Sequence, residues 1–193
     1  MALPGGEPDA WSALRPPLKG TAAFLALYAL LAAPFLLQEG FEFELLLLSS
    51  VLALALAVLS AIDLSTYRLP DLVTLPLTAL GLIATPLVLE ASLWWQVASA
   101  VLGFALMAGL ALVYTKLRGR PGLGLGDAKL LAAAGAWLGA EALPSVLLWA
   151  CGSALLALLL RAWRTGALSA QARVAFGPFL AFGTWLVWLY GPL

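Results

Sequence analysis

The feature that most constrains this chain is a series of solid apolar runs, of which residues 45–62 read LLLLSSVLALALAVLSAI. A spanning helix needs about 20 mostly apolar residues, whereas a membrane strand alternates apolar and polar positions. The whole sequence is 63% apolar and 10% charged, against roughly 45–50% and about 25% in a soluble domain. The pattern therefore predicts an all-α, polytopic membrane helix bundle and excludes an ordinary soluble globule.

Seven such runs are expected to cross the membrane. Their ranges are 21–38, 45–62, 71–89, 92–115, 128–140, 142–163 and 175–191. The fifth range is shorter than a full crossing needs, so we expect it to be tilted or half-buried. Residues 1–20 would then form a short cytoplasmic tail, and residues 21–191 one transmembrane domain.

Charge separates the two sides of this arrangement. All ten basic residues lie before the first predicted span, between the second and third, around the loop before the fifth, or between the sixth and seventh: Arg15, Lys19, Arg68, Lys116, Arg118, Arg120, Lys129, Arg161, Arg164 and Arg173. The other connections carry only acidic charges, among them Glu42, Glu90 and Glu141. The positive-inside rule therefore predicts a cytoplasmic N-terminus and a C-terminus outside.

Several function classes are excluded by residues that the sequence lacks. It has no histidine and a single cysteine, Cys151, which rules out histidine-based triads, intrachain disulfides and cysteine-based zinc clusters. Its ten basic and ten acidic residues leave no net charge, whereas nucleic-acid binding needs a basic excess. We therefore expect no metal, no cofactor and no nucleic-acid partner, and the expected surroundings are the lipid bilayer.

Two patterns are expected to serve packing. Tryptophans lie toward the predicted outer ends of the spans, as in the aromatic belts of membrane proteins: Trp94, Trp95, Trp137, Trp185 and Trp188. Gly135 and Gly139 are four residues apart in GAWLG, a spacing typical of close helix–helix contact.

Three carboxylates lie at predicted membrane boundaries, where ionisable groups are costly and are functional candidates. Asp63 ends the second predicted span, Asp71 begins the third, and Asp127 precedes the fifth. Two crossings separate Asp63 from Asp127, so both return to the same face of the membrane. Two carboxylates about 3 Å apart share one proton, and this arrangement supports aspartyl proteolysis.

Each carboxylate also has a structural interpretation. Asp71 follows Pro70 and is placed to cap a helix. Asp127 could cap the next helix in the same way, so capping and catalysis both stay open for it. Asp63 could pair with Arg68, although the C-terminal end of a helix disfavours a carboxylate.

A glycine-rich loop precedes Asp127. Gly122, Gly124 and Gly126 alternate in PGLGLGD, and glycine permits positive φ and the close approach of another segment. Lys129 is expected either to bind a lipid phosphate or to act on the carboxylate pair. We take Gly124, Gly126 and Lys129 as a candidate active-site loop.

Three blocks together resemble the prepilin peptidases, the membrane aspartyl proteases of type IV pilus and type II secretion systems. They are residues 57–82 (AVLSAIDLSTYRLPDLVTLPLTALGL), 122–139 (GLGLGDAKLLAAAGAWLG) and 176–191 (FGPFLAFGTWLVWLYG). The resemblance implies a catalytic aspartate in each of the first two blocks, at Asp63 and Asp127. It gives Gly177 and Pro178 an architectural role at the start of the last helix.

The resemblance also implies a substrate and a location. Prepilins and pseudopilins carry a short basic leader that stays cytoplasmic, followed by a hydrophobic helix, and are cleaved after a glycine at that junction. A multi-pass protein of the bacterial inner membrane with its aspartates at the cytoplasmic face would lie beside this bond. Fuller members bear an N-terminal region with paired CxxC motifs and methylate the new N-terminus with S-adenosylmethionine. Residues 1–20 stand in its place here, so we expect no zinc module and no methylation, in a chain that is either truncated or a short, peptidase-only member.

Two other functions would use the same aspartates. A presenilin-like intramembrane protease also has a Gly-x-Gly-Asp motif, but this chain lacks a Pro-Ala-Leu motif near its end. An ion-coupled transporter could carry protons on Asp63 and Asp127. It would place them near the middle of the membrane within an inverted repeat, a pattern that the sequence does not show.

Overall fold

The computed structural model describes residues 17–36, 43–119, 124–165 and 174–193. These residues contain no strand and form seven α-helices and one short 3-10 helix: α1 (Leu18–Leu36), α2 (Phe43–Thr66), α3 (Asp71–Val88), α4 (Leu93–Arg118), α5 (Leu125–Leu138), η1 (Ala140–Ala142), α6 (Leu143–Thr165) and α7 (Gly177–Tyr190). Each predicted span coincides with one α-helix to within a few residues. The prediction of an all-α bundle is confirmed.

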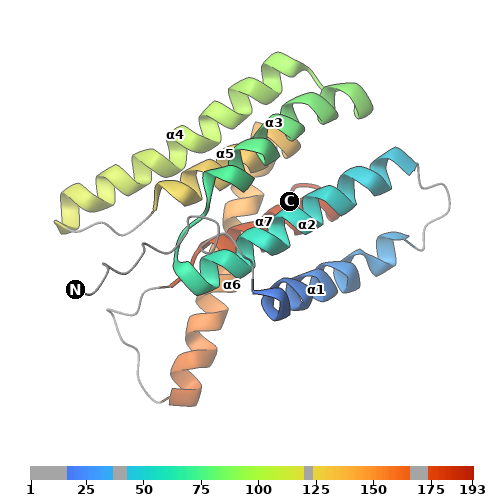
Figure 1. The fold of residues 1–193 in the computed structure, drawn as a ribbon. Helices are drawn as coiled ribbons and strands as arrows, with labels where there is room; N and C mark the ends of the chain where they lie inside the picture. The colour runs from blue at the N-terminus through green and yellow to red at the C-terminus, as the bar shows by residue number, and fades with distance from the viewer. Residues whose placement is uncertain (1–16, 37–42, 120–123, 166–173) are drawn as a thin grey trace, which may run out of the picture.

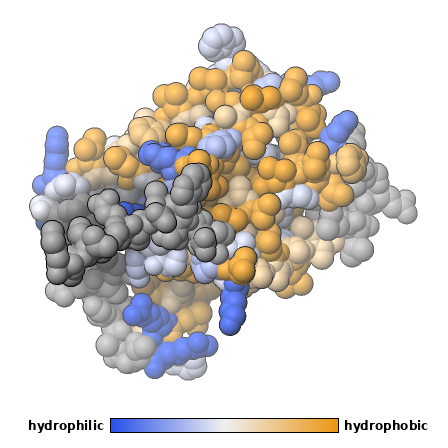
Figure 2. All heavy atoms as spheres, in the orientation of Figure 1, coloured by the Kyte–Doolittle hydropathy of each residue, from blue (hydrophilic) through white to orange (hydrophobic). Residues whose placement is uncertain are grey.

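Four stretches are long and apolar enough to cross a membrane, judged by length and composition: Phe43–Thr66, Asp71–Val88, Leu93–Arg118 and Ala140–Arg164. Shorter apolar helices cover Leu18–Pro34 and Gly177–Tyr190. In Figure 2, hydrophobic residues cover most of the coloured face in view, and hydrophilic residues lie mainly at its margins. The chain is therefore a helical membrane protein, and the count of seven crossings stays a prediction.

The short helix α5 lies at the centre of the bundle. It packs against α3, α4 and α7, and most of its residues from Ala128 to Trp137 are buried. Its 14 residues measure about 21 Å at 1.5 Å per residue, less than the roughly 30 Å of a bilayer's hydrocarbon core. Longer helices cover it, which explains how so short an apolar helix is accommodated.

The helix ends gather the predicted site residues at one end of the bundle. In Figure 1, α2 runs toward the turn that leads into α3, and α5 and α7 begin on that same side, at the left of the view. α2 also packs against α1, α3 and α7. The end of α2 and the starts of α3, α5 and α7 therefore meet at one end of the molecule.

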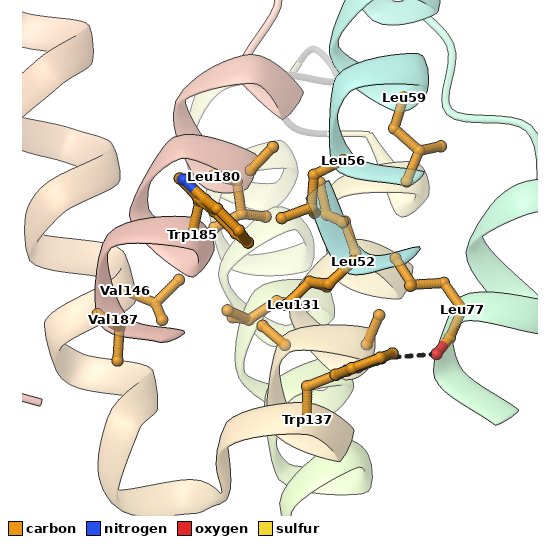
Figure 3. Close-up of a cluster of buried hydrophobic side chains, with 14 of the residues drawn as sticks. Leu52, Leu56, Leu59, Leu77, Leu131, Trp137, Val146, Leu180, Trp185 and Val187 are labelled. Carbon is orange, nitrogen blue, oxygen red and sulfur yellow. Dashed lines mark hydrogen bonds between the residues drawn. The ribbon is translucent and has the colours of Figure 1, made fainter. Parts of the chain in front are cut away.

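The core between these helices is built mainly of leucine and alanine. Leu52 and Leu56 of α2 lie with Leu131 of α5 and Leu180 of α7 in one buried cluster (Figure 3). Lipid tails are as apolar as leucine, so within a membrane such a cluster is stabilised by close packing more than by exclusion of water. This packing fixes how α2, α5 and α7 lie relative to one another.

The tryptophans correct the prediction of an aromatic belt. Trp94 is 81% exposed, but Trp137 and Trp185 are each 2% exposed. The indole N–H of Trp137 donates to the Leu77 carbonyl at 2.8 Å (Figure 3), and that of Trp185 donates to the Tyr28 carbonyl at 3.1 Å. A buried indole needs a hydrogen-bond acceptor, and these backbone carbonyls supply it inside the bundle.

The two glycines of GAWLG have separate roles. A Cβ added at Gly135 would lie 2.4 Å from the Ser99 carbonyl oxygen of α4, so the prediction of close helix packing is confirmed there. Gly139 instead ends α5 with φ +86°, a backbone conformation that favours glycine. Only the first of the pair belongs to a packing face.

Candidate active site

Asp63 lies in the last turn of α2 and points into the bundle. Its side chain is 5% exposed, and its Oδ2 accepts a hydrogen bond from the backbone N–H of Gly177 at 2.9 Å. A buried carboxylate without such a donor would be costly. Among the described residues, Asp63 forms no ion pair with Arg68. The hydrogen bond that holds its carboxylate comes from the first turn of α7.

The start of α7 is built so that this donor is free. Pro178 has no N–H, and the N–H of Phe179 bonds to the Phe176 carbonyl at 3.1 Å. The N–H of Gly177 has no partner within its own helix, as is usual in a first turn, and Asp63 accepts it. The carboxylate therefore caps a helix that lies far from it in the sequence, and the favourable N-terminal end of α7 offsets its position at the end of α2.

Gly177 also makes the room for this contact. A Cβ at this position would lie 2.7 Å from Asp63 Oδ2 and 3.1 Å from its Cγ. Cβ atoms essentially never lie within 3.0 Å of a non-bonded atom, so only glycine lets the carboxylate reach the backbone here.

Asp127 lies in the first turn of α5. Its Oδ2 accepts a hydrogen bond from the N–H of Gly124, the residue before the helix, at 3.4 Å. This is the reciprocal half of a capping box, so Asp127 contributes to the cap from the third position of α5, and Gly124, not Asp127, is the N-cap residue. This contribution leaves the catalytic interpretation open, because the bond is long and the side chain is only half-buried.

The two carboxyl groups act on each other. Asp127 lies outside the expected membrane-spanning segments. It precedes the fifth predicted span, and α5 is not among the stretches that are long and apolar enough to cross a membrane. Burial and, to a smaller extent, the nearby charge of Asp63 raise the pKa of the Asp127 carboxyl from 3.8 to about 6, while the Gly124 N–H acts to lower it. The charges of the two aspartates therefore interact, which disfavours ionisation of both at once.

The turn between α2 and α3 packs against the start of α5. Tyr67 turns the chain with φ +54°, and the buried Leu69 then lies over α5. A Cβ added at Gly126 would be 2.9 Å from the Leu69 Cβ. The expectation that a glycine before Asp127 permits close approach is confirmed at Gly126.

The other loop glycines do not share this role. Gly124 has φ −83°, and a Cβ there would meet Asp127 Oδ2 only at 3.7 Å, an ordinary contact. Gly124 therefore uses neither the positive φ nor the close approach that glycine permits. Gly122 lies outside the described residues.

Asp71 and Lys129 form an ion pair. α3 begins at Asp71 itself, and no side chain caps its N-terminus, so the prediction that Asp71 caps the helix is wrong. The ammonium group of Lys129 reaches the carboxylate instead, since α3 and α5 begin at the same end of the bundle. Lys129 thus joins α5 to α3 and is not directed at Asp63.

Gly177 donates to Asp63, a role beyond the architectural one that the family resemblance implies for it. Its signal lay in FGPF, where a glycine precedes a proline at a helix start. That pattern predicts the helix but does not say which distant side chain its free N–H will meet.

The fold and the paired carboxyl groups define a helical membrane protein with an acidic site at one end of its bundle. The chain belongs to the type IV leader peptidase family, whose model matches residues 50–160. This match contains Asp63 and Asp127 and stops short of Gly177. No solved structure matches the chain.

The chain is similar to proteins named prepilin leader peptidase/N-methyltransferase. It is 44% identical over 132 residues to one from Burkholderia pseudomallei, which is 68% of this chain and 42% of the relative. It is 43% identical over 153 residues to one from Dickeya chrysanthemi, 78% of this chain and 52% of the relative. It is 36% identical over 142 residues to one from Pseudomonas aeruginosa, which is 73% of this chain and 48% of the relative. The chain thus spans about half the length of the curated relatives it matches.

Proposed function

We propose that this chain is a membrane aspartic endopeptidase that removes the basic leader from type IV prepilins or type II secretion pseudopilins. Asp63 and Asp127 would form its catalytic pair. The observation that carries the proposal is the match to the type IV leader peptidase family over residues 50–160, which contain both aspartates, and the electrostatic interaction between the two carboxyls supports it. Residues 21–191 are taken as one peptidase domain.

The chemistry follows from one proton shared between two carboxyl groups. The ionised member takes a proton from water, whose oxygen bonds to the peptide carbonyl carbon, while the protonated member gives its proton to the carbonyl oxygen. Collapse of this intermediate breaks the C–N bond and returns both groups to their starting states. Neither a metal nor a covalent intermediate takes part in this scheme.

The place of the pair suits a substrate with a charged leader and an apolar helix. Basic residues Lys19, Lys116 and Lys129 belong to the same ends of the helices as the two aspartates. By the positive-inside rule this end faces the cytoplasm, and we assign the chain to the bacterial inner membrane. A scissile bond between leader and helix would lie at this boundary, where water is available.

Cleavage of purified prepilins by the full chain in membranes tests the proposal. We expect Asp63→Asn and Asp127→Asn each to lower the rate by about 1000-fold or more, because asparagine keeps the size but cannot carry the proton. Asp71→Asn is the matched control: it removes a carboxylate at the same end, and we expect cleavage to stay within a few-fold of wild type. Protein abundance is measured for all three.

Two results would overturn the proposal. Cleavage by Asp63→Asn together with its loss in Asp71→Asn would show that the first aspartate is assigned wrongly. If the wild-type chain leaves every prepilin intact while proton-coupled uptake depends on both aspartates, the chain is a transporter and not a peptidase.

A further inference from the structure

The two members of the proposed pair are held differently. Asp63 Oδ2 accepts the Gly177 N–H at 2.9 Å from a separate helix, α7. Asp127 Oδ2 accepts the Gly124 N–H at 3.4 Å from its own helix. A short bond from an N–H to a carboxylate favours the ionised form more than a long one. The pair is therefore asymmetric before any substrate binds.

We propose that Gly177 is a positioning residue of the active site, whose N–H holds Asp63 as the ionised member of the pair and leaves Asp127 as the protonated one. This rests on the proposed peptidase function. Asp63 is then the group that takes the proton from water, and Asp127 is the group that protonates the carbonyl oxygen.

Steric contact makes this assignment specific to glycine. An added Cβ at position 177 would stand 2.7 Å from Oδ2 and 3.3 Å from the Asp63 Cβ. Rotation of the Asp63 side chain moves Oδ2 away and breaks the hydrogen bond, and the 3.3 Å contact with the Asp63 Cβ then needs a shift of only a few tenths of an ångström. Alanine is therefore expected to remove the interaction and leave the fold.

Few other charges bear on Asp63. Among the described residues, the titratable side chains at this end of the helices packed around it, or on the turn after it, are Lys19 and Tyr28 of α1, Tyr67 and Arg68 after α2, Asp71 of α3, and Asp127 and Lys129 of α5. Lys129 and Asp71 pair with each other, and Tyr28 bonds to Ser60 at 3.5 Å. Asp127 is the charge recorded as interacting with Asp63. The first turn of α7 holds no titratable side chain.

The assignment gives a balanced cycle. Asp63 takes a proton from water as the hydroxyl oxygen bonds to the carbonyl carbon, and Asp127 gives its proton to the carbonyl oxygen. Asp63 then passes its new proton to the amide nitrogen while Asp127 takes one from a hydroxyl of the intermediate, and the C–N bond breaks. Asp63 ends ionised and Asp127 protonated, ready for another substrate.

The test compares Gly177→Ala with a matched change on the same helix, Gly183→Ala. A Cβ at Gly183 would lie 2.5 Å from the Val146 carbonyl oxygen, so it disturbs the packing of α7 without meeting Asp63. Both are assayed as full chains in bilayers against a purified prepilin, at temperatures where circular dichroism shows them folded. The readouts are kcat, KM and the pH profile.

For Gly177→Ala we expect kcat to fall about 10- to 100-fold with little change in KM, and the acidic limb of the pH profile to move up by about one unit. Gly183→Ala should lower the melting temperature and leave that limb in place. A chain in which glycolic acid replaces Gly177 removes the N–H with no added atom, and it should reproduce the shift even if Gly177→Ala does not fold.

The failure of this proposal is distinguishable from failure of the peptidase function. Suppose that Asp63→Asn and Asp127→Asn abolish cleavage but the chain with glycolic acid at position 177 keeps the acidic limb of the wild-type pH profile. Gly177 then does not hold Asp63 in its ionised form, and the peptidase proposal stands. An equal shift in Gly183→Ala would also overturn it, because the effect would then come from α7 packing in general.

Discussion

Glycine is used in two ways in this molecule, at the α4–α5 interface and at the first turns of α5 and α7. At the interface, an added Cβ at Gly103 would lie 2.5 Å from the Leu131 carbonyl oxygen, and one at Gly135 2.4 Å from that of Ser99. At the first turns, the nearest atoms are side-chain atoms, those of Leu69 for Gly126 and Asp63 for Gly177.

This difference separates stability from placement. A backbone carbonyl cannot rotate away, so Gly103 and Gly135 set the distance between two helices, as small residues do in membrane bundles. The carboxylate that faces Gly177 can rotate, and the Leu69 Cβ that faces Gly126 moves only with the α2–α3 turn, so these two glycines instead set where a carboxylate and a turn lie. We therefore expect substitutions in the first region to cost folding, and those in the second to cost activity.

The largest effect is expected from Gly135→Val. Its side chain would meet the backbone of α4, and we expect overpacking of about 3 kcal/mol or more, enough to lower the abundance of the chain in membranes. Gly109→Ala on α4 is the control, because nothing lies within 4 Å of a Cβ there. Thermal melting followed by circular dichroism measures both variants. A wild-type melting temperature for Gly135→Val would show that the glycines at the α4–α5 interface do not set stability.

Gly126→Ala should have a smaller effect, of another kind. The added methyl would press on the Cβ of Leu69 and shift the α2–α3 turn, and a small misplacement of catalytic groups is enough to cost about 10- to 100-fold in rate. Steady-state cleavage and melting are measured on the same preparation. If Gly126→Ala lowers the melting temperature in proportion to the loss of activity, Gly126 serves stability, as Gly135 does, and not the position of the site residues.

The pH dependence should fall next in size. Burial and the charge of Asp63 raise the pKa of Asp127 to about 6, and the mechanism needs Asp127 protonated. Since the protonated fraction falls as pH rises through that value, kcat should drop about tenfold for each unit above it. A kcat profile between pH 4 and 8, with melting recorded alongside, checks this. If kcat already falls as the pH rises through about 4, the charge of Asp63 does not raise the pKa of Asp127.

Lys129→Met should have the smallest effect. Lys129 pairs with Asp71 at a solvent-exposed site, where such pairs contribute about 0–1 kcal/mol, so we expect cleavage to fall no more than about threefold. Lys116→Met, at the end of α4, controls for the loss of one positive charge. In a double-mutant cycle with Asp71→Asn, additive effects would show that the pair contributes no coupling.

The helices and their order could be predicted because apolar length depends on local sequence alone. That Asp63 and Asp127 lie at the same end of the bundle could be predicted as well, since an even number of crossings returns the chain to one face. The partners of Asp71, Trp137 and Gly177 could not. Each depends on how a helix is rotated about its axis, and apolar residues surround these helices so evenly that no face is marked in the sequence.

The bond between Asp63 and Gly177 joins residues 114 positions apart in the chain, and this bears on biosynthesis. A nascent chain that has emerged only as far as α6 already contains both aspartates. It does not yet contain the donor that orders Asp63, which arrives with the last helix. The site is therefore completed only when α7 enters the bundle, so the protein would acquire its chemistry late, after the other helices are in place.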